Sequence, residues 1–274
     1  MSVNPFSKPT FLALNREAEL SVRLICDGVN ALRKASRAPD TYSALFSITM
    51  GLERLGKLCF LLDRYFKGKG EFPTDKELRN VGHDIDALSK EIVRIATDRK
   101  MDKPELFILH ENVSESIIAC LSEFARGARY YNLDTLVGSK KTAPKDPIVR
   151  WREDVGQPVL DKHYPQWRRE KDTTLAQSLG GVLDTVSFTM GVSQSNSPID
   201  SQVQAIAISK EANYLKKWVP FYILRIVRVF ARVVIELSYE TYKRHDLLPV
   251  PHMMDHFGRF LNNDDFLKNH SVCS

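Results

Sequence analysis

The sequence predicts an all-α protein, a packed helical bundle made of two intimately associated halves. Apolar residues recur three and four positions apart over several long segments, which is typical of amphipathic and buried helices. Period-two alternation, the pattern of a half-buried strand, is scarce. We therefore expect helix in more than about 60% of the residues, well above the third that is usual in globular proteins.

Size and composition limit the class of protein. The chain has 274 residues, enough for one large domain or two small ones, and 43% of them are hydrophobic and 27% charged. A disordered chain has fewer apolar residues and a stronger charge imbalance, so we exclude that class. The net charge of +5 is compatible with an anionic partner without requiring one.

The cysteines and the hydropathy pattern indicate a cytoplasmic protein with no membrane partner. The N-terminus has no signal-peptide pattern, and the most apolar stretch, 218–237, is interrupted by three arginines and a glutamate. The four cysteines form no Cys-x-x-Cys pair and no zinc-binding cluster. We therefore expect reduced thiols in the core at the three positions that lie in apolar helical patterns, which are Cys26, Cys59 and Cys120.

The first half, residues 1–137, contains four expected helices. They cover about 12–35, 41–66, 75–97 and 114–132. Pro39 and Asp40 separate the first two, Gly82 interrupts the third, and Ser114 is the expected N-cap of the fourth. Because all four have apolar faces, we expect them to pack on one another.

A polar segment at 138–147, GSKKTAPKDP, reads as a linker to the second half, 148–274. A charged, Trp-containing segment at 148–171 comes first, followed by an apolar helix at about 175–190 and a loop at 193–198. A long helix is expected over about 200–242, with a kink at Pro220, and a short one near 253–261.

The long helix carries a concentrated basic stripe. Between Lys210 and Arg232 there are six basic residues and one acid, Glu211, an excess equal to the net charge of the whole chain. A wheel of 100° per residue places the polar and aromatic residues on one arc, and most of the rest of the surface is apolar. The arc consists of Trp218, Phe221, Arg225, Arg228, Arg232, Glu236 and Tyr239.

Two interpretations of this stripe remain open. In the first, Trp218, Arg225, Arg228 and Arg232 line a groove for phosphate or nucleic acid, where arginines make bidentate contacts and aromatic rings offer stacking faces. In the second, the arginines pair with carboxylates of neighbouring helices, since a buried charge without a partner is costly. The sequence does not decide between a ligand groove and a structural network.

The second helix contains one pair of charges in a largely apolar context. Glu53 and Lys57 lie four residues apart, an orientation that stabilises a helix by about 0.3 kcal/mol. So small a gain does not explain charges in so apolar a helix. We expect them either to be half-buried, where they meet the arginine stripe or line the same cleft, or to form an exposed pair at a rim.

Histidines suggest two further sites. His83 beside Asp84 fits a general base, or a helix start in which Asp84 caps and His83 makes a structural hydrogen bond. His252 and His256 have metal-ligand spacing on a helix, but no Glu of the zinc-protease motif and no third ligand accompany them. We find no nucleophile elbow, Walker loop or dinucleotide fingerprint, and we expect no metal and no cofactor.

The segment from Ala44 to Lys90 resembles the HEPN superfamily of prokaryotic helical domains, in particular its abortive-infection members. The residues that carry the resemblance are GLERLGKL at 51–58, GHDIDALSKEI at 82–92 and FARGARYYNLD at 124–134. The resemblance covers about half of the chain. It implies a helical bundle, often a homodimer, from phage-defence or toxin–antitoxin systems or a mobile element.

Many members of this superfamily cut RNA without a metal, with an Arg and a His about four to six residues apart. The nearest pair in this chain, Arg79 and His83, has only three residues between its members. One residue of helix rotates a side chain by about 100°, so the pair departs from the family pattern. Non-catalytic members, which bind nucleotides or nucleic acid, match better.

Three functional hypotheses follow. The first is a non-enzymatic, HEPN-like protein that binds RNA, a nucleotide or a partner protein. The second is a metal-independent ribonuclease that uses Arg79 and His83. The third is a structural interaction module in which internal ion pairs consume the arginine stripe. A cleft lined by the arginines favours the first, and their complete internal pairing favours the third.

Overall fold

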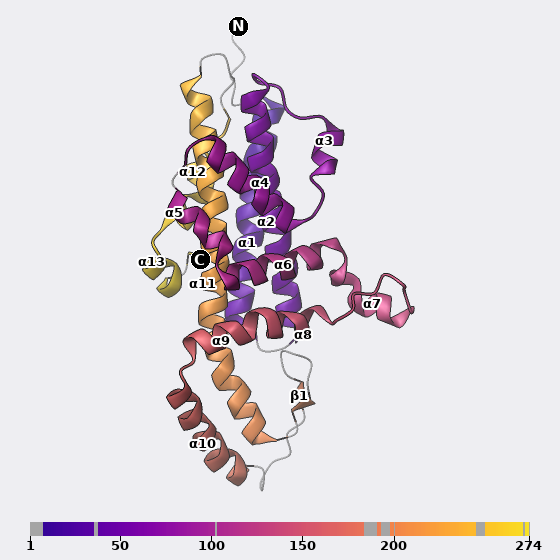
Figure 1. Ribbon diagram of the computed structural model, residues 1–274, viewed down its shortest axis with the longest axis vertical. Coiled ribbons are helices and arrows are strands. Elements are labelled where there is room, and N and C mark those ends of the chain that lie inside the picture. The colour runs from indigo at the N-terminus through magenta and orange to yellow at the C-terminus, as the bar shows by residue number, and fades with distance from the viewer. Residues whose placement is uncertain are drawn as a thin grey trace.

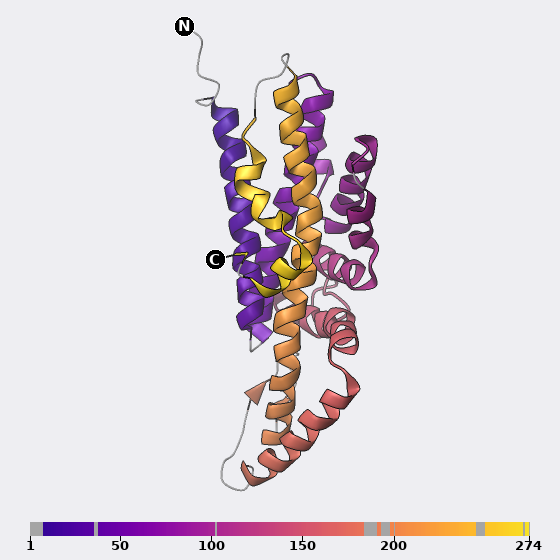
Figure 2. The ribbon, with the colours of Figure 1, turned by 90° about the vertical axis from the view of Figure 1, so that its left-hand side faces the viewer.

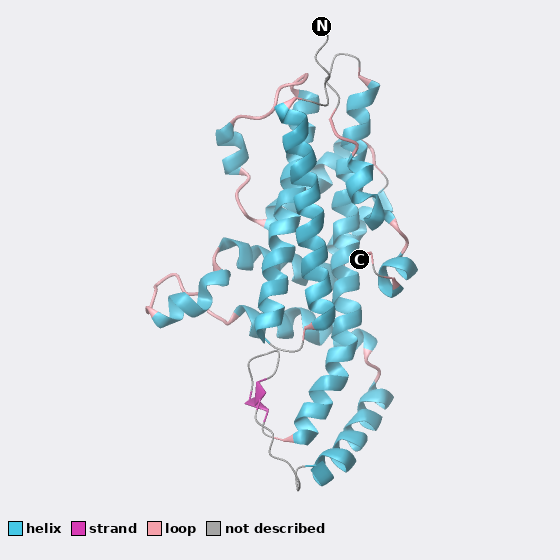
Figure 3. Cartoon of the chain, turned by 180° about the vertical axis from the view of Figure 1, so that it is seen from behind, coloured by secondary structure: helices cyan, strands magenta, loops and turns pink. Residues whose placement is uncertain are grey.

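A computed structural model describes residues 8–35, 38–101, 103–183, 191–192, 198–199, 201–244, 250–270 and 272–273. The fold is all-α, as predicted, and helices make up most of the described residues (Figures 1 and 3). The one sheet among them is a pair of two-residue strands, β1 (Gly191–Val192) and β2 (Pro198–Ile199), which are antiparallel with Gly191 opposite Ile199.

Five helices build the bundle: α1 (Pro9–Lys34), α2 (Ala38–Lys67), α4 (Ile85–Asp98), α6 (Asn112–Arg126) and α11 (Gln202–Lys243). Helices α1 and α2 form an antiparallel hairpin, and α11 packs along both of them over the length of the molecule (Figure 2). The 42 residues of α11 extend past the bundle at its N-terminal end, where α10 (Gln166–Leu183) pairs with it. The two form a helical arm at the bottom of Figure 1.

Shorter elements surround the bundle. They are α3 (Asp75–Asn80), α5 (Lys103–Leu106), η2 (Phe107–His110), η3 (Ala128–Tyr130), α7 (Tyr131–Leu136), α8 (Pro147–Trp151), the π-helical turn η4 (Arg152–Gly156), α9 (Gln157–His163), α12 (Met253–Phe257), η5 (Gly258–Leu261) and α13 (Asp264–Asn269). Across these ranges no helix is both long enough and apolar enough to cross a bilayer.

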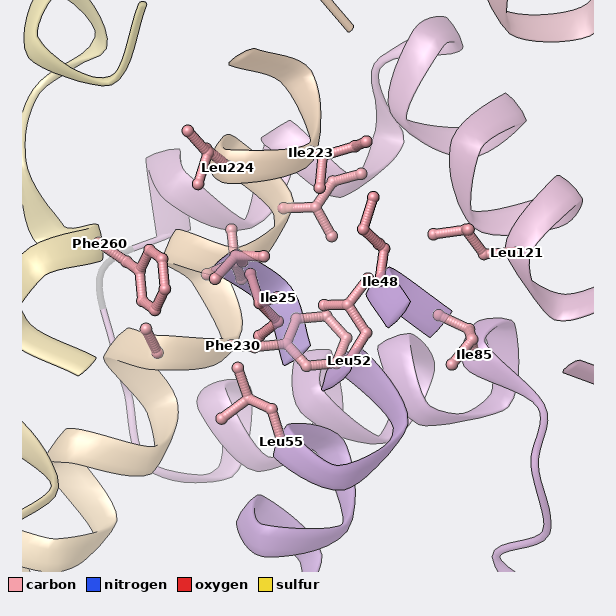
Figure 4. Close-up of a cluster of buried hydrophobic side chains, with 14 of the residues drawn as sticks. Ile25, Ile48, Leu52, Leu55, Ile85, Leu121, Ile223, Leu224, Phe230 and Phe260 are labelled. Carbon is pink, nitrogen blue, oxygen red and sulfur yellow. The ribbon is translucent and has the colours of Figure 1, made fainter. Parts of the chain in front are cut away.

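One hydrophobic core spans both predicted halves. Its fully buried residues come from α1, α2, α4 and α6 in the first half and, in the second, from α11 and η5 together with η4, α9, α12 and α13. Figure 4 shows members from six of these elements converging, among them Ile25, Leu52, Ile85, Leu121, Phe230 and Phe260. Segment 138–147 therefore joins two sets of helices that share a core, and within it Asp146 caps α8 by accepting hydrogen bonds from Ile148 N and Val149 N.

Glycines set the close approach of α1 to α2. A Cβ added at Gly28 would lie 2.5 Å from Ile48 Cγ1 and 2.8 Å from the Ala44 carbonyl oxygen, and one at Gly51 would lie 2.9 Å from Ile25 N. Real Cβ atoms do not come so close to backbone atoms, so only glycine permits this spacing. Four cysteines are buried and unbridged, which confirms the expected free thiols.

Several expected boundaries were wrong. Pro39 and Asp40 lie inside the first turn of α2, where a missing N–H costs little. The fourth helix begins at Asn112 and ends at Arg126, with Glu111 rather than Ser114 at the N-cap, because Ser114 is buried in the first turn. Helix α10 begins at Gln166, earlier than predicted, and α11 continues through Pro220 as one helix. Residues 184–190, and 193–197 of the predicted loop, lie outside the described residues.

Candidate functional site

The three arginines of the stripe on α11 each pair with a carboxylate of another element. Arg225 donates two hydrogen bonds to Glu111, at 2.6 and 2.7 Å. Arg228 lies 2.7 Å from Asp264 Oδ1 in an ion pair and donates to the Asn262 carbonyl oxygen at 2.9 Å. Arg232 Nε lies 2.6 Å from Glu105 Oε2.

This pairing favours the structural interpretation of the stripe. The side chains of Arg225 and Arg228 are only 14% and 9% exposed, so their charges are compensated inside the protein rather than held open. Burial is the largest single effect on the pKa of Arg225 and lowers it, but the hydrogen bonds that Arg225 donates to Glu111 and the charges of Glu111 and Asp264 together raise the pKa above its usual value. Arg225 also lines a cleft.

Glu53 and Lys57 do not meet the arginine stripe, so that expectation was wrong. The Glu53 side chain is 6% exposed, and its Oε1 accepts from Lys57 Nζ at 2.7 Å and contacts His83 Nδ1 at 2.8 Å. Helix α4 packs closely on α2 near this contact: a Cβ at Gly56 would lie 3.1 Å from Leu88 Cδ2. Helix α2 and the start of α4 thus bring together two sites that the sequence suggested separately.

His83 lies in the turn before α4, and Asp84 is the N-cap of that helix, as predicted for the helix-start interpretation. Asp84 accepts from Asp86 N at 3.0 Å and from Ala87 N at 3.3 Å, and the residue before His83, Gly82, has φ +67°. The His83 side chain is 60% exposed, and its Nε2 has no hydrogen-bond partner among the described residues. The predicted structural hydrogen bond of His83 is its contact with Glu53.

Arg79, the predicted partner of His83 in catalysis, pairs elsewhere. Its Nε lies 2.9 Å from Asp75 Oδ2 within α3, and both side chains are more than 70% exposed. Arg79 therefore forms a surface ion pair with Asp75, the residue four positions earlier, whereas His83 contacts Glu53. No direct contact joins Arg79 to His83 within the described residues.

His252 and His256 make separate contacts. The ring of His252 stacks on Tyr242 with centroids 4.1 Å apart, and His256 Nε2 lies 3.0 Å from Asn15 Oδ1. Burial lowers the pKa of His256. Within the described ranges, no group of three or more His, Cys, Asp and Glu side chains is arranged to hold a metal ion.

A cleft of about 620 Å³ lies where α9 crosses α11, close to the first residues of α6 and to α13. Its wall contains Lys162 and His163 from α9, Tyr222 and Arg225 from α11, and Asp264 from α13. In Figure 1 this region is the junction between the bundle and the helical arm. In this cleft, residues of the predicted stripe reach a cavity of ligand size.

The rings of His163, Phe221 and Tyr222 line the cleft and pack with Trp218, which lies behind them outside the cleft wall. The His163 ring stacks on Trp218 with centroids 3.6 Å apart and planes 7° apart, and His163 Nε2 lies 2.9 Å from the Tyr222 hydroxyl. Phe221 packs edge-on against both Trp218 and Tyr222. The arrangement is a fixed aromatic platform, because each ring is oriented by at least one other.

Lysines surround this platform. Lys162 Nζ lies 5.4 Å from the centre of the Tyr222 ring, and Lys217 Nζ and Lys268 Nζ each lie 5.7 Å from that of Trp218. Lys268 pairs with Asp265 at 3.0 Å, whereas Lys162 and Lys217 form no ion pair within the described part of the chain. Of these two lysines, Lys162 lies in the wall of the cleft and Lys217 lies beside Trp218.

The same environment keeps His163 neutral. Burial lowers its pKa to about 4, and the charges of Lys162 and Lys268 act in the same direction. At neutral pH the His163 imidazole is therefore uncharged, so it can stack face to face on Trp218 without placing a charge in this half-buried position.

Sequence reasoning found Trp218 and Arg225 from the helical wheel and missed Lys162, His163, Tyr222 and Lys268. His163 and Tyr222 are separated by 59 positions in the chain and come together only because α9 crosses α11. The unusual composition of 148–171 was the only available signal, and it carries no information about which helix face that segment meets.

The fold and the cleft define a class: a helical protein with a cleft between its bundle and a projecting arm, lined by aromatic rings and by Lys162. Comparison of the chain with protein-family models, with curated proteins and with solved structures gave no match.

Proposed function

We propose that the protein is a non-catalytic, HEPN-like binding protein that takes a nucleotide or single-stranded RNA in the cleft between α9 and α11. The observation that carries the proposal is the combination of a rigid aromatic platform with two unpaired lysines on its rim. A base offers a π-face to the rings and a phosphate offers negative charge to the ammonium groups, so one ligand class satisfies both.

The internal pairing of the arginines refines this proposal. Arg228 and Arg232 already have carboxylate partners, so we assign the phosphate contacts to Lys162 and Lys217 instead. Arg225 lines the cleft but is held by two hydrogen bonds to Glu111. A partner protein with acidic side chains would engage the lysines but would leave the aromatic platform unused.

The test measures the affinity for a labelled single-stranded RNA and for a nucleoside triphosphate, each at several salt concentrations. The double variant Lys162→Glu/Lys217→Glu is expected to weaken binding roughly tenfold or more and to reduce the salt slope of RNA binding by about 1.4, because each lost phosphate contact removes about 0.7. Comparison of the two ligands separates a nucleotide site from an RNA site.

A matched control carries the same change in charge. Lys76 and Lys141 are exposed and lie in α3 and in segment 138–147, away from the cleft, so Lys76→Glu/Lys141→Glu is expected to bind with nearly unchanged affinity. Equal loss in both double variants shows only a nonspecific charge effect. If the protein binds neither RNA nor the nucleoside triphosphate but does bind an acidic peptide, the proposal is wrong and a protein-interaction function replaces it.

A second candidate function is a metal-independent ribonuclease. The specific observation in its favour is the 2.8 Å contact between Glu53 and His83 Nδ1. A carboxylate on one ring nitrogen fixes the tautomer and leaves the other nitrogen as a general base. Against it, Arg79 is paired with Asp75 and the spacing of Arg79 and His83 departs from the family pattern.

We expect no cleavage of RNA by either the wild-type protein or His83→Ala in the presence or absence of EDTA. Gel analysis of a labelled RNA after prolonged incubation checks this expectation. Cleavage that resists EDTA and disappears in His83→Ala, while the melting temperature is retained, establishes the second candidate. Cleavage that persists in His83→Ala removes His83 from any mechanism.

A further inference from the structure

Two of the four cysteines meet although 246 residues separate them in the chain. Cys26 lies in α1, and the backbone of Cys273, after α13, is held by Asn30, one turn further along α1, which places the two thiols close enough to shift each other's pKa. Their residues are 8% and 7% exposed, so the contact lies just below the surface. The other two thiols are isolated from them, Cys59 beside the Phe230 carbonyl oxygen and Cys120 in α6.

Hydrogen bonds from side chains of α1 to carbonyl oxygens of the later segment hold the pair in place. Asn30 Nδ2 donates to the Cys273 carbonyl oxygen at 2.7 Å, and Asn30 lies one turn after Cys26 on the same face of α1. Arg33, near the end of α1, donates to the His270 carbonyl oxygen at 3.4 Å. The segment after α13 is therefore fastened along α1 by contacts that do not involve sulfur.

The two thiols differ in their readiness to ionise. The hydrogen bond from Cys273 lowers the pKa of Cys26 against the opposing effect of burial, and the nearby Arg259 guanidinium contributes in the same direction. The same hydrogen bond, together with burial, raises the pKa of Cys273. The contact thus favours ionisation of Cys26 over that of Cys273.

We propose that Cys26 and Cys273 form an oxidation site, at which a peroxide converts the contacting thiols into an intramolecular disulfide between α1 and the C-terminal segment. A reactive thiol with a second thiol at contact distance is the arrangement that turns a reversible oxidation into a disulfide.

The chemistry balances with hydrogen peroxide as the oxidant. The Cys26 thiolate attacks one peroxide oxygen, the O–O bond breaks, and Cys26 sulfenic acid and hydroxide result. The Cys273 sulfur then attacks the Cys26 sulfur, the S–S bond forms and the S–O bond breaks. The hydroxyl group leaves with the Cys273 proton as water. Peroxide gains two electrons, and each thiol loses one.

The disulfide would connect the first bundle helix to the segment that carries α13. Asp264 and Lys268 of α13 stand beside the α9–α11 cleft, and Asp264 also holds Arg228. Oxidation would therefore restrict the motion of one wall of the cleft. The oxidation site itself does not depend on what the cleft binds.

The experiment treats the reduced native protein with hydrogen peroxide, blocks remaining thiols with an alkylating agent in denaturant, and maps the products by mass spectrometry. The intact chain is expected to lose about 2 Da, the mass of two hydrogens, and to keep only two of its four alkylatable thiols. Peptide mapping should show Cys26 linked to Cys273, and a reductant should restore all four thiols.

Cys59 and Cys120 are internal controls in the same molecules. Burial raises the pKa of both thiols, that of Cys120 to about 11. Because the thiolate is the form that reacts with peroxide, both should stay reduced and be alkylated after denaturation. In Cys273→Ser, the Cys26 sulfenic acid should persist and be trapped by dimedone. Four free thiols after peroxide, a link between two chains, or Cys26 oxidised to sulfinic acid without a link would each overturn the proposal.

Discussion

Arg228 shows how the partners of a single residue determine whether its charge stabilises the fold or is open to a ligand. Its side chain is 9% exposed on a helix that is apolar over most of its surface, and it meets Asp264 and the Asn262 carbonyl oxygen. A charge in such a place is stabilised only by its partners. The wheel placed the arginine on a charged stripe of a largely apolar helix, but a wheel contains no partner residues.

The first prediction at this scale concerns Arg228→Met. Methionine retains much of the apolar volume but leaves the Asn262 carbonyl oxygen unsatisfied and removes one partner of Asp264. We expect a loss of about 1–3 kcal/mol in the free energy of unfolding, because unpaired buried polar groups cost that much. Denaturant titration measures the loss, and polyanion affinity measured in parallel should not change.

The control is Arg79→Met, which removes an arginine that is also ion-paired but is 79% exposed. The free energy of unfolding of Arg79→Met should lie within about 0.5 kcal/mol of the wild-type value, as is usual when a surface ion pair is removed. If Arg228→Met leaves stability unchanged or raised and weakens polyanion binding, the stripe is a ligand groove after all.

A second prediction concerns pH. The pKa of His163 is lowered to about 4 by burial, with Lys162 and Lys268 contributing, whereas an unfolded histidine titrates near 6.5. The unfolded state therefore binds the proton first, so the stabilising contribution of neutral His163 is complete above about pH 6.5 and is lost as the pH falls toward 4.

Melting temperatures of the wild type and His163→Gln between pH 7.5 and 4 check this. Glutamine keeps a polar group near Tyr222 but does not titrate, so the wild type should lose more stability on acidification than the variant does. Comparison of the two chains cancels the contribution of carboxylates that titrate in both, such as Asp63. Parallel curves for the two proteins would contradict the assigned pKa.

At the scale of elements, the long periodic helices were predictable and the short ones were not. Helices α1, α2 and α11 each bury a continuous apolar surface that the sequence displays. Elements such as η2, η4 and α9 have four to seven residues, too few for a period to be visible. Their conformation is determined by the helices they lie against, as in the case of α9, which packs on α11.

The candidate site divides in the same way. Trp218 and Arg225 lie on a long helix, so their shared face followed from spacing alone. Lys162 and His163 lie on α9, and nothing in their local sequence specifies that α9 crosses α11 at Trp218. Glu53 and His83 were each noticed, but their contact lies where α4 packs closely on α2, which is a property of packing.

At the scale of the whole molecule, ion pairs and core contacts join the two predicted halves. Arg99 pairs with Asp63 of α2 at 2.8 Å and with Glu240 of α11, and Arg150 of α8 pairs with Glu123 of α6. Hydrogen bonds from Arg99 and Lys67 lower the pKa of Asp63 despite its burial, which indicates a compensated charge at this junction. The pairs of Arg225 with Glu111 and Arg232 with Glu105 cross the same boundary.

The last prediction is that residues 1–137 and 148–274 unfold together. All three tryptophans, Trp151, Trp167 and Trp218, lie in the second half, so fluorescence reports on that half alone, whereas far-ultraviolet circular dichroism reports on helices of both. Because the halves share one core, the two signals should give the same denaturant midpoint. Separate midpoints would instead indicate two independent domains.

A substitution in the first half sharpens the test. Leu52 of α2 is fully buried in the shared core (Figure 4), so Leu52→Ala should cost about 2–5 kcal/mol and lower the fluorescence midpoint, although every tryptophan lies in the other half. Leu136→Ala is the control, because Leu136 is 82% exposed in α7 and its loss should leave the midpoint nearly unchanged. A Leu52→Ala protein whose circular dichroism shifts while its fluorescence midpoint stays fixed would separate the halves energetically. A common shift means that the arm, the cleft and the α1–α2 hairpin are stabilised as one cooperative unit.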